Sequence, residues 1–377
     1  TKFAQSDTLI EDARNKTKLV FNSQLSLSQK VHAVKSFILP TLDYILTNSS
    51  CKVSSLARLD SFIRGMIMNG AETQRIPKEF AHIPSRNGGL GIPNLQMKGD
   101  MMKIENYISG LLSTNKKISD MTALFTLEEK HTRGIVEDNE SKRFFNWAFG
   151  GDTGNAVIQS HSNRGTDCAA IKAMHTCISN DISFYVEDGT KLMLSHNGIT
   201  KRIASIKNAK ETLREFVCKD LIEGIQNNRV HGHSFTGPTT KESHPFRNTV
   251  PINDSIFKFI IKGRTNTLPT EGNIHDWTGN GNGLCKHCNE GKETLHHLLN
   301  NCKHKMQFYT YRHNIVANIL RDAIRVKINP EYYKESCQVS LNEITDGRVT
   351  EGISPNNTHL RPDIIYMDSD NELTVIE

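Results

Sequence analysis

The sequence predicts a mainly α, multidomain protein that contains a small zinc-binding module and ends in an α/β part. Three observations support this fold class. The chain has 377 residues, apolar residues recur at helical spacing in several segments, and three cysteines and three histidines fall between Cys285 and Cys302. One hydrophobic core rarely serves a chain of this length, so we expect two or three domains.

The composition is that of a folded, water-soluble chain. Hydrophobic residues make up 37% and charged residues 23% of the sequence, which argues against a disordered chain and against a membrane protein. No run reaches the roughly 18 apolar residues of a membrane span, and the opening residues do not form a signal peptide. The other five cysteines are scattered singly, so we expect reduced thiols and a cytosolic or nuclear protein.

The net charge of +5 is unevenly distributed. Residues 201–264 carry twelve Lys and Arg against six acids, and residues 285–330 carry eight against three. Residues 331–377 carry three basic residues against ten acids. A basic middle is typical both of a nucleic-acid surface and of ordinary solvated helix faces, and charge alone does not separate these two interpretations.

Two amphipathic helices are predicted in the first hundred residues. In "SLSQKVHAVKSFILP" the apolar spacing indicates a short helix, with Ser28 as its cap and Pro40 as its stop. In "SSLARLDSFIRGMIMNG" apolar residues recur at intervals of three and four positions, and we expect the helix to end at Gly70. We expect the apolar residues of the second helix to pack against one another and against the rest of the core.

The segment after these helices, "PSRNGGLGIPNL", predicts a sharply turned loop. No strand precedes it, so a phosphate-binding loop is disfavoured. From residue 98 to about residue 200 only "KIENYISGLL" shows a helical pattern, and the remainder has no clean periodicity.

A long basic helix is predicted for "SIKNAKETLREFVCKDLIEGI". Its apolar residues lie mostly on one side. The basic residues chosen as candidate nucleic-acid contacts are Lys207, Lys210, Arg214, Lys219 and, further along the chain, Arg264. The following loop carries His231, His233 and His244, which we interpret as surface histidines because no spaced cysteine accompanies them.

The cluster "CKHCNEGKETLHHLLNNC" predicts a structural zinc site. Two cysteines three positions apart form a turn that lets both thiolates reach one ion, and Cys285 and Cys288 have this spacing. His297 and Cys302 complete a C-x2-C-x8-H-x4-C pattern. His296 is the main alternative for the third ligand and His287 a weaker one; His297 is preferred because its spacing to Cys302 resembles that of known zinc knuckles.

The last residues, "HLRPDIIYMDSDNELTVIE", predict a β-hairpin with its turn at residues 368–371. Asp363 precedes one strand and Glu377 follows the other, so both carboxylates could reach one Mg²⁺ ion, as nuclease chemistry requires. Restriction-type nucleases carry the pattern PD, a spacer, and then (D/E)-x-K. Pro362, Asp363 and Glu377 match it, but the sequence stops before the lysine position.

The order of these motifs resembles one family. The helix ending "FILPTLDY", the "GGLGIP" loop, the zinc cluster followed by "YRHNIV", and "RPDIIY" with Glu377 are similar to the C-terminal part of a site-specific non-LTR retrotransposon reverse transcriptase with a restriction-like endonuclease. The stretch "IIKGRTNTLPT" is similar to the family segment before its knuckle. The resemblance covers nearly the full length and is thin between residues 106 and 255.

The resemblance implies a domain plan. Residues 1–100 would be the end of the palm and the helical thumb, 101–284 a mainly helical basic linker, 285–305 a CCHC zinc knuckle, and 306–377 the first part of an incomplete α/β restriction-endonuclease-like domain. It also implies structural Zn²⁺ at Cys285, Cys288, His297 and Cys302, and Mg²⁺ at Asp363 and Glu377.

The function implied by the resemblance is target-primed reverse transcription, with element RNA and target DNA as partners and the nucleus as the site of action. No membrane and no small-molecule substrate are implied. The sequence holds neither the aspartate pair of a polymerase nor the nuclease lysine, so the enzyme activity of this chain itself stays open. The alternatives are a non-catalytic zinc-dependent nucleic-acid-binding module and a zinc-stabilised scaffold that binds only proteins.

Overall fold

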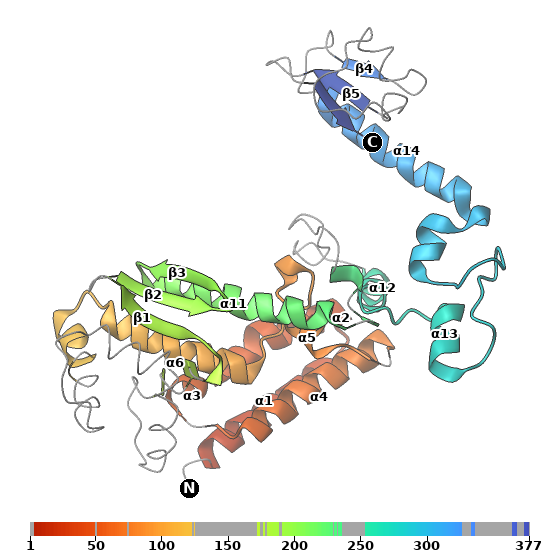
Figure 1. The fold of residues 1–377 in the computed structure, drawn as a ribbon. Helices are drawn as coiled ribbons and strands as arrows, with labels where there is room; N and C mark the ends of the chain where they lie inside the picture. The colour runs from red at the N-terminus through yellow and green to blue at the C-terminus, as the bar shows by residue number, and fades with distance from the viewer. Residues whose placement is uncertain are drawn as a thin grey trace. The chain divides into compact units, whose positions relative to one another are not determined.

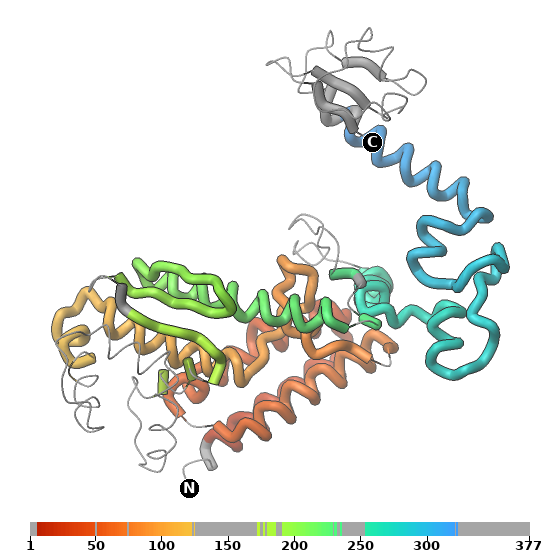
Figure 2. Tube along the Cα trace, viewed as in Figure 1, coloured from red at the N-terminus to blue at the C-terminus, as the bar shows by residue number. Residues whose placement is uncertain are grey.

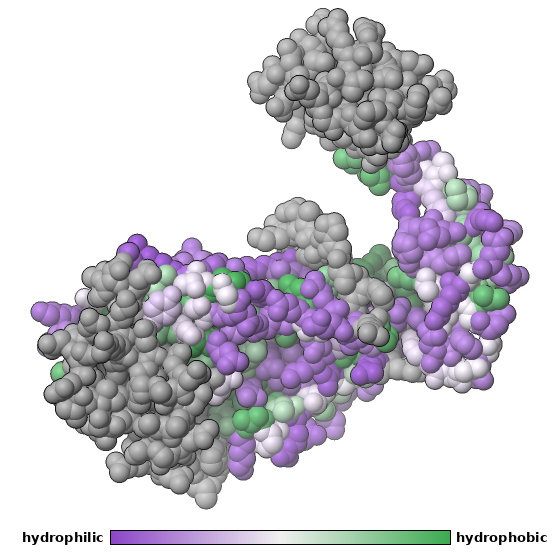
Figure 3. Space-filling view, viewed as in Figure 1, coloured by the Kyte–Doolittle hydropathy of each residue, from purple (hydrophilic) through white to green (hydrophobic). Residues whose placement is uncertain are grey.

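The computed structural model divides the chain into two compact units, Thr1–Leu268 and Pro269–Glu377 (Figures 1 and 2). The structure describes residues 4–49, 51–73, 75–122, 124, 172–173, 176–177, 179–187, 191–228, 230–231, 233–235, 253–325, 333–335, 364–367 and 373–376. Hydrophilic residues cover most of the described surface on the face shown in Figure 3. Within these residues no helix combines the length and the apolar character that crossing a membrane requires.

The first unit is mostly helical and contains one small sheet. Its helices are α1 (Ala4–Phe21), α2 (Leu27–Ala33), η1 (Val34–Ile38), η2 (Leu39–Leu42), α3 (Asp43–Asn48), α4 (Val53–Ala71), α5 (Lys78–His82), η3 (Ser85–Asn87), α6 (Leu95–Leu111), α11 (Ile206–Gln226), η4 (His233–Phe235) and α12 (Asp254–Arg264). The antiparallel sheet has the order β1 (Ser183–Glu187), β2 (Lys191–His196) and β3 (Ile199–Ile203).

The second unit contains helices and a second small sheet. Its elements are α13 (Glu271–Thr278), η6 (His297–Asn301), η7 (Lys303–Lys305), α14 (Met306–Arg325), β4 (Tyr333–Glu335), β5 (Ile364–Met367) and β6 (Leu373–Ile376). A mostly helical chain with small sheets is compatible with the predicted mainly α class. The four functional domains stay predictions, and the predicted boundary at residue 100 falls inside α6.

Helix α2 shows where local sequence signals were misread. Ser26, not the predicted Ser28, is its N-cap: the Ser26 hydroxyl accepts from the Gln29 amide, and the Gln29 side chain accepts from the Ser26 amide. Pro40 does not end the helical path. It lies at the start of η2, where a missing N–H costs nothing because the first amides of a helix have no partner within it.

Helix α4 forms as predicted, and its apolar face is buried. Leu59, Ile63 and Ile67 are at most 1% exposed in the main core of the first unit. The helix continues through Gly70 to Ala71, and Glu72 takes the left-handed conformation that was expected at the glycine. Gly70 instead serves packing, because a Cβ there would lie 2.7 Å from a methyl of Leu27 on α2.

The "GGLGIP" segment forms the predicted sharply turned loop. It folds back on α5, with the Leu90 amide donating to Phe80 O at 3.1 Å and the Gly91 amide to Ile83 O at 2.8 Å. A Cβ at Gly89 would lie 2.3 Å from the same Ile83 oxygen. Glycine at this position lets the two backbone segments approach closely.

A second core lies between the sheet, α6 and α11, which adjoin one another in Figure 1. Phe184 of β1, Tyr107 of α6 and Phe216 of α11 are each 1% exposed. His196 at the end of β2 links the layers: its Nε2 lies 2.8 Å from the Asp220 carboxylate of α11, and its Nδ1 lies 3.1 Å from Asp181 O.

The sheet was not predicted, although the sequence contained one signal for it. Asn197 and Gly198 both have positive φ, at 46° and 76°, and join β2 to β3. Asn-Gly is the preferred pair for a two-residue hairpin turn, because both positions require the left-handed region.

Candidate metal centre and nucleic-acid interface

The structure brings Cys285, Cys288, His297 and Cys302 together in the second unit. Their ligand atoms all lie within 4.8 Å of one another. Cys285 and Cys302 are fully buried, whereas Cys288 and His297 are half-buried. The group can therefore hold a metal ion at the edge of a small module.

The spacing of these atoms fits tetrahedral zinc. With a Zn–S distance of about 2.3 Å, neighbouring sulfur atoms of a tetrahedron are about 3.8 Å apart, and a sulfur and a nitrogen are about 3.5 Å apart. The Sγ atoms of Cys285 and Cys302 are 3.9 Å apart, and Cys288 Sγ is 3.3 Å from His297 Nε2. Four protein ligands around one ion would make a closed site, which is the structural type.

The two other histidines of the cluster do not join this group. His296 is exposed, and its Nδ1 lies 3.2 Å from the Asn300 side-chain nitrogen. His287 is exposed within the cysteine turn. The geometry thus favours His297 over both alternatives that the sequence left open.

Backbone amides support the cysteine turn. The Cys285 amide donates to Gly291 O and the Asn289 amide to Cys285 O, both at 2.8 Å, and Asn289 has a positive φ of 55°. The Glu290 backbone amide donates to the Cys288 thiol and lowers its pKa. Amide donors of this kind favour the thiolate that binds metal.

Residues other than the four ligands hold the ligands in position. The buried Glu293 carboxylate accepts from the Lys286 amide at 3.0 Å and from the Glu271 amide of α13 at 2.9 Å. On the other side, the Tyr309 hydroxyl of α14 accepts from the Cys302 amide at 2.9 Å and donates to Leu298 O at 2.9 Å. The module therefore depends on the segments before and after its four ligands.

The predicted basic helix is α11, and it is amphipathic as expected. Its N-cap is Ser205, and Leu213, Phe216 and Ile225 are buried. Two of the candidate nucleic-acid contacts, Lys207 and Arg214, are exposed.

The other three candidate contacts already have protein neighbours. Lys210 lies 3.8 Å from Glu105 of α6, and Lys219 lies 3.7 Å from Glu223. Arg264 stacks on Phe235, with its guanidinium carbon 4.7 Å from the ring centre, and burial lowers its pKa. Arg264 therefore packs against the protein at the end of α12.

The two strands of the predicted C-terminal hairpin pair with each other, while its predicted turn at residues 368–371 lies outside the described residues. Strands β5 and β6 pair antiparallel, with Ile364 opposite Ile376 and Met367 opposite Leu373. Asp363 and Glu377, the predicted Mg²⁺ ligands, lie outside the described residues. They directly precede Ile364 and directly follow Ile376 in the sequence.

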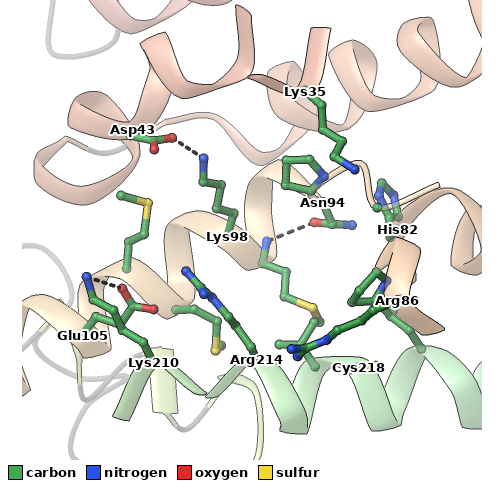
Figure 4. Close-up of a pocket in the computed structure, with 18 residues that line it drawn as sticks. Lys35, Asp43, His82, Arg86, Asn94, Lys98, Glu105, Lys210, Arg214 and Cys218 are labelled. Carbon is green, nitrogen blue, oxygen red and sulfur yellow. Dashed lines mark hydrogen bonds and ion pairs between the residues drawn. The ribbon is translucent and has the colours of Figure 1, made fainter. Parts of the chain in front are cut away.

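A cavity of about 720 Å³, which was not predicted from the sequence, lies in the first unit (Figure 4). The "GGLGIP" loop, α6 and α11 line it, and we call it the basic groove after its cationic residues Lys35, Arg86, Lys98, Lys210 and Arg214. These residues come from four separate segments. The sequence holds no signal that would gather them, because the groove exists only through packing of the loop and the two helices.

The fold and the site define a mostly helical chain with a three-cysteine, one-histidine group that can bind zinc. No protein-family model matches the chain. Over 134 residues the chain is 25% identical to the retrovirus-related Pol polyprotein from a type-2 retrotransposable element of Drosophila melanogaster. This match covers 34% of the chain and 13% of the polyprotein.

A second relative is an uncharacterized protein of Caenorhabditis elegans, which is 24% identical over 112 residues, or 29% of the chain and 30% of that protein. The matches therefore span a minor part of either relative. The chain has distant similarity to a retrotransposon polyprotein, which suggests a role related to retroelements.

Proposed function

We propose that the chain is a portion of a non-LTR retrotransposon polyprotein, or descends from one, and that it binds nucleic acid during target-primed reverse transcription. The distant similarity to the Drosophila polyprotein carries this proposal. The Cys3His group supports it, since closed zinc modules stabilise small nucleic-acid-binding folds. Element RNA and target DNA are the proposed partners, and the nucleus is the proposed compartment.

In this proposal the zinc module is structural, and the surface of α11 contributes phosphate contacts. Lys207 and Arg214 are exposed on that helix, and Lys210 and Lys219 of the same helix are half-buried. Each cation that neutralises a phosphate releases condensed counterions from the nucleic acid, so binding should depend steeply on salt.

Binding of the full chain to a labelled duplex should therefore weaken about a hundredfold between roughly 50 and 200 mM salt, if the four cations each contact a phosphate. Fluorescence anisotropy at several salt concentrations measures this. A Lys207→Gln/Lys219→Gln variant should reduce the slope of log K against log salt by about two. Affinity that does not change with salt would instead favour a scaffold that binds only proteins.

We also propose that Asp363 and Glu377 hold Mg²⁺ in the endonuclease of the parent protein. The pairing of Ile364 with Ile376 supports this, because these residues are the sequence neighbours of the two acids. One metal ion between two carboxylates would activate water for attack on a phosphodiester. Asp363→Ala in the intact parent protein should abolish Mg²⁺-dependent nicking without loss of DNA binding, and equal nicking by the variant would refute the role.

A further inference from the structure

The basic groove combines two kinds of surface. Five cations line it against two acids, Asp43 and Glu105. Its other lining residues are largely apolar: Met97, Met101, Met102, Val217, Leu221, Pro84 and Pro93. A ligand that fits must present negative charge and flat or apolar surface side by side.

Three of the five cations are already bound to protein atoms. Lys98 forms an ion pair with Asp43, and Lys210 lies 3.8 Å from Glu105. Lys35 donates to Ser85 Oγ at 3.1 Å and to Leu90 O at 3.2 Å, which anchors the "GGLGIP" loop. These contacts fix the walls of the groove.

The remaining two cations are Arg86 of η3 and Arg214 of α11. Both are exposed, and among the described residues neither guanidinium has an ion-pair or hydrogen-bond partner. Figure 4 shows Arg86 reaching from the loop toward α11 and Arg214 reaching from α11 toward α6. Arginine forms a planar fork that binds phosphate through two parallel hydrogen bonds, and its flat face also stacks on bases.

We propose that the basic groove binds single-stranded nucleic acid, with phosphates on Arg86 and Arg214 and bases against the half-buried Met97 and Met102. Duplex bases are stacked and paired, so a duplex offers its phosphates but cannot lay a base on this apolar floor. A single strand exposes both groups at once. The inference rests on the proposed function and names which form of nucleic acid this part of the first unit binds.

The test compares binding of a labelled single-stranded oligothymidine and of a labelled duplex to the full chain. An Arg86→Glu/Arg214→Glu variant should weaken single-strand binding about a hundredfold, because two charge-assisted contacts are lost. The matched control is Arg58→Glu/Arg202→Glu, which changes the net charge equally at two exposed arginines outside the groove. The control should weaken single-strand binding far less than the groove variant.

A second variant tests the apolar floor. Met97→Ala/Met102→Ala should weaken single-strand binding about tenfold and leave the salt dependence unchanged, because no charge is removed. Competition with polyglutamate of equal total charge should displace little of the bound oligothymidine, because a polyglutamate chain carries no bases.

The outcomes separate the two proposals. If the groove variant and its control bind single strands equally, or polyglutamate competes as well as oligothymidine, the groove proposal is wrong and the proposed function stands. If the parent chain binds the duplex but no single strand, the groove proposal is again wrong. If the parent chain binds neither, both proposals fail.

Discussion

Replacing Cys288 with serine should remove the bound zinc from the protein and unfold the module around residues 283–302. The four ligand atoms lie within 4.8 Å of one another, so the loss of one leaves an incomplete tetrahedron. Structural zinc contributes about 10 kcal/mol or more to the folding of small modules, and we expect most of this to be lost. Zinc stoichiometry by atomic emission and hydrogen exchange over this segment measure both effects.

His296→Ala is the matched control for this experiment. His296 is exposed, and its Nδ1 lies against Asn300, so the variant should keep one zinc per chain and the exchange protection of the parent protein. His297→Ala should behave like Cys288→Ser. Loss of zinc in the His296 variant with retention in the His297 variant would show that the ligand assignment is wrong.

The first unit should become less stable as the pH rises from about 4 to about 8, because of Asp60. This carboxyl on α4 is largely buried, and its Oδ2 accepts from the Leu95 amide at 3.2 Å at the start of α6. Its Oδ1 has no hydrogen-bond partner among the residues that the structure describes. Burial raises the pKa of Asp60 from 3.8 to about 7, although the Leu95 amide, Lys78 and Arg64 oppose the shift.

The direction of the pH effect follows from proton binding. Between pH 3.8 and about 7 the native Asp60 holds a proton that the unfolded chain has released. The stability that the protonated carboxyl contributes is complete below the unfolded pKa and is lost as the pH rises through the folded pKa. The shift corresponds to about 4 kcal/mol at pH 8.

Asp60→Asn should remove this pH dependence, because the amide stays neutral and its oxygen can still accept from Leu95. The variant should exceed the parent in stability by about 4 kcal/mol at pH 8, and the difference should shrink as the pH falls toward 4. Urea unfolding, followed through hydrogen exchange of α4 and α6 peptides, measures it. His82, which faces the same small cavity, is present in both proteins, so its own titration largely cancels.

The control for this comparison is Asp12→Asn on α1, where the carboxylate is half exposed and pairs with Lys16. This substitution should change the free energy of unfolding only slightly, and by the same amount at every pH above 5. The contrary result for Asp60 is that the parent and Asp60→Asn differ in free energy of unfolding by the same amount at every pH from 5 to 8. That result would show that Asp60 is ionised throughout this range in the native protein.

Local patterns predicted those parts of the structure that depend on neighbouring residues in the sequence. The apolar periodicity of α4 and α11 placed both buried faces correctly, and the two apolar runs on either side of residues 368–371 predicted the paired strands β5 and β6. The spacing of Cys285, Cys288, His297 and Cys302 matched the group that the structure assembles. Such features need no knowledge of the remaining fold.

Features that depend on long-range packing could not be predicted. Arg86 and Arg214 are 128 positions apart in the sequence, and only the packing of η3, α6 and α11 places them in one groove. The same holds for Asp60, whose raised pKa depends on the approach of α6 to α4. Gly70 was misread for a related reason, because its role is contact with Leu27 and not helix termination.

The hydrogen bonds of Tyr309 also set an order of events during synthesis. The last ligand, Cys302, leaves the ribosome seven residues before the hydroxyl that accepts from its amide. Zinc can therefore be captured first, but the loop before Cys302 is secured only when the first turn of α14 has emerged and folded. A nascent chain paused between these two positions would hold its metal in a looser, more exchangeable state than the finished protein.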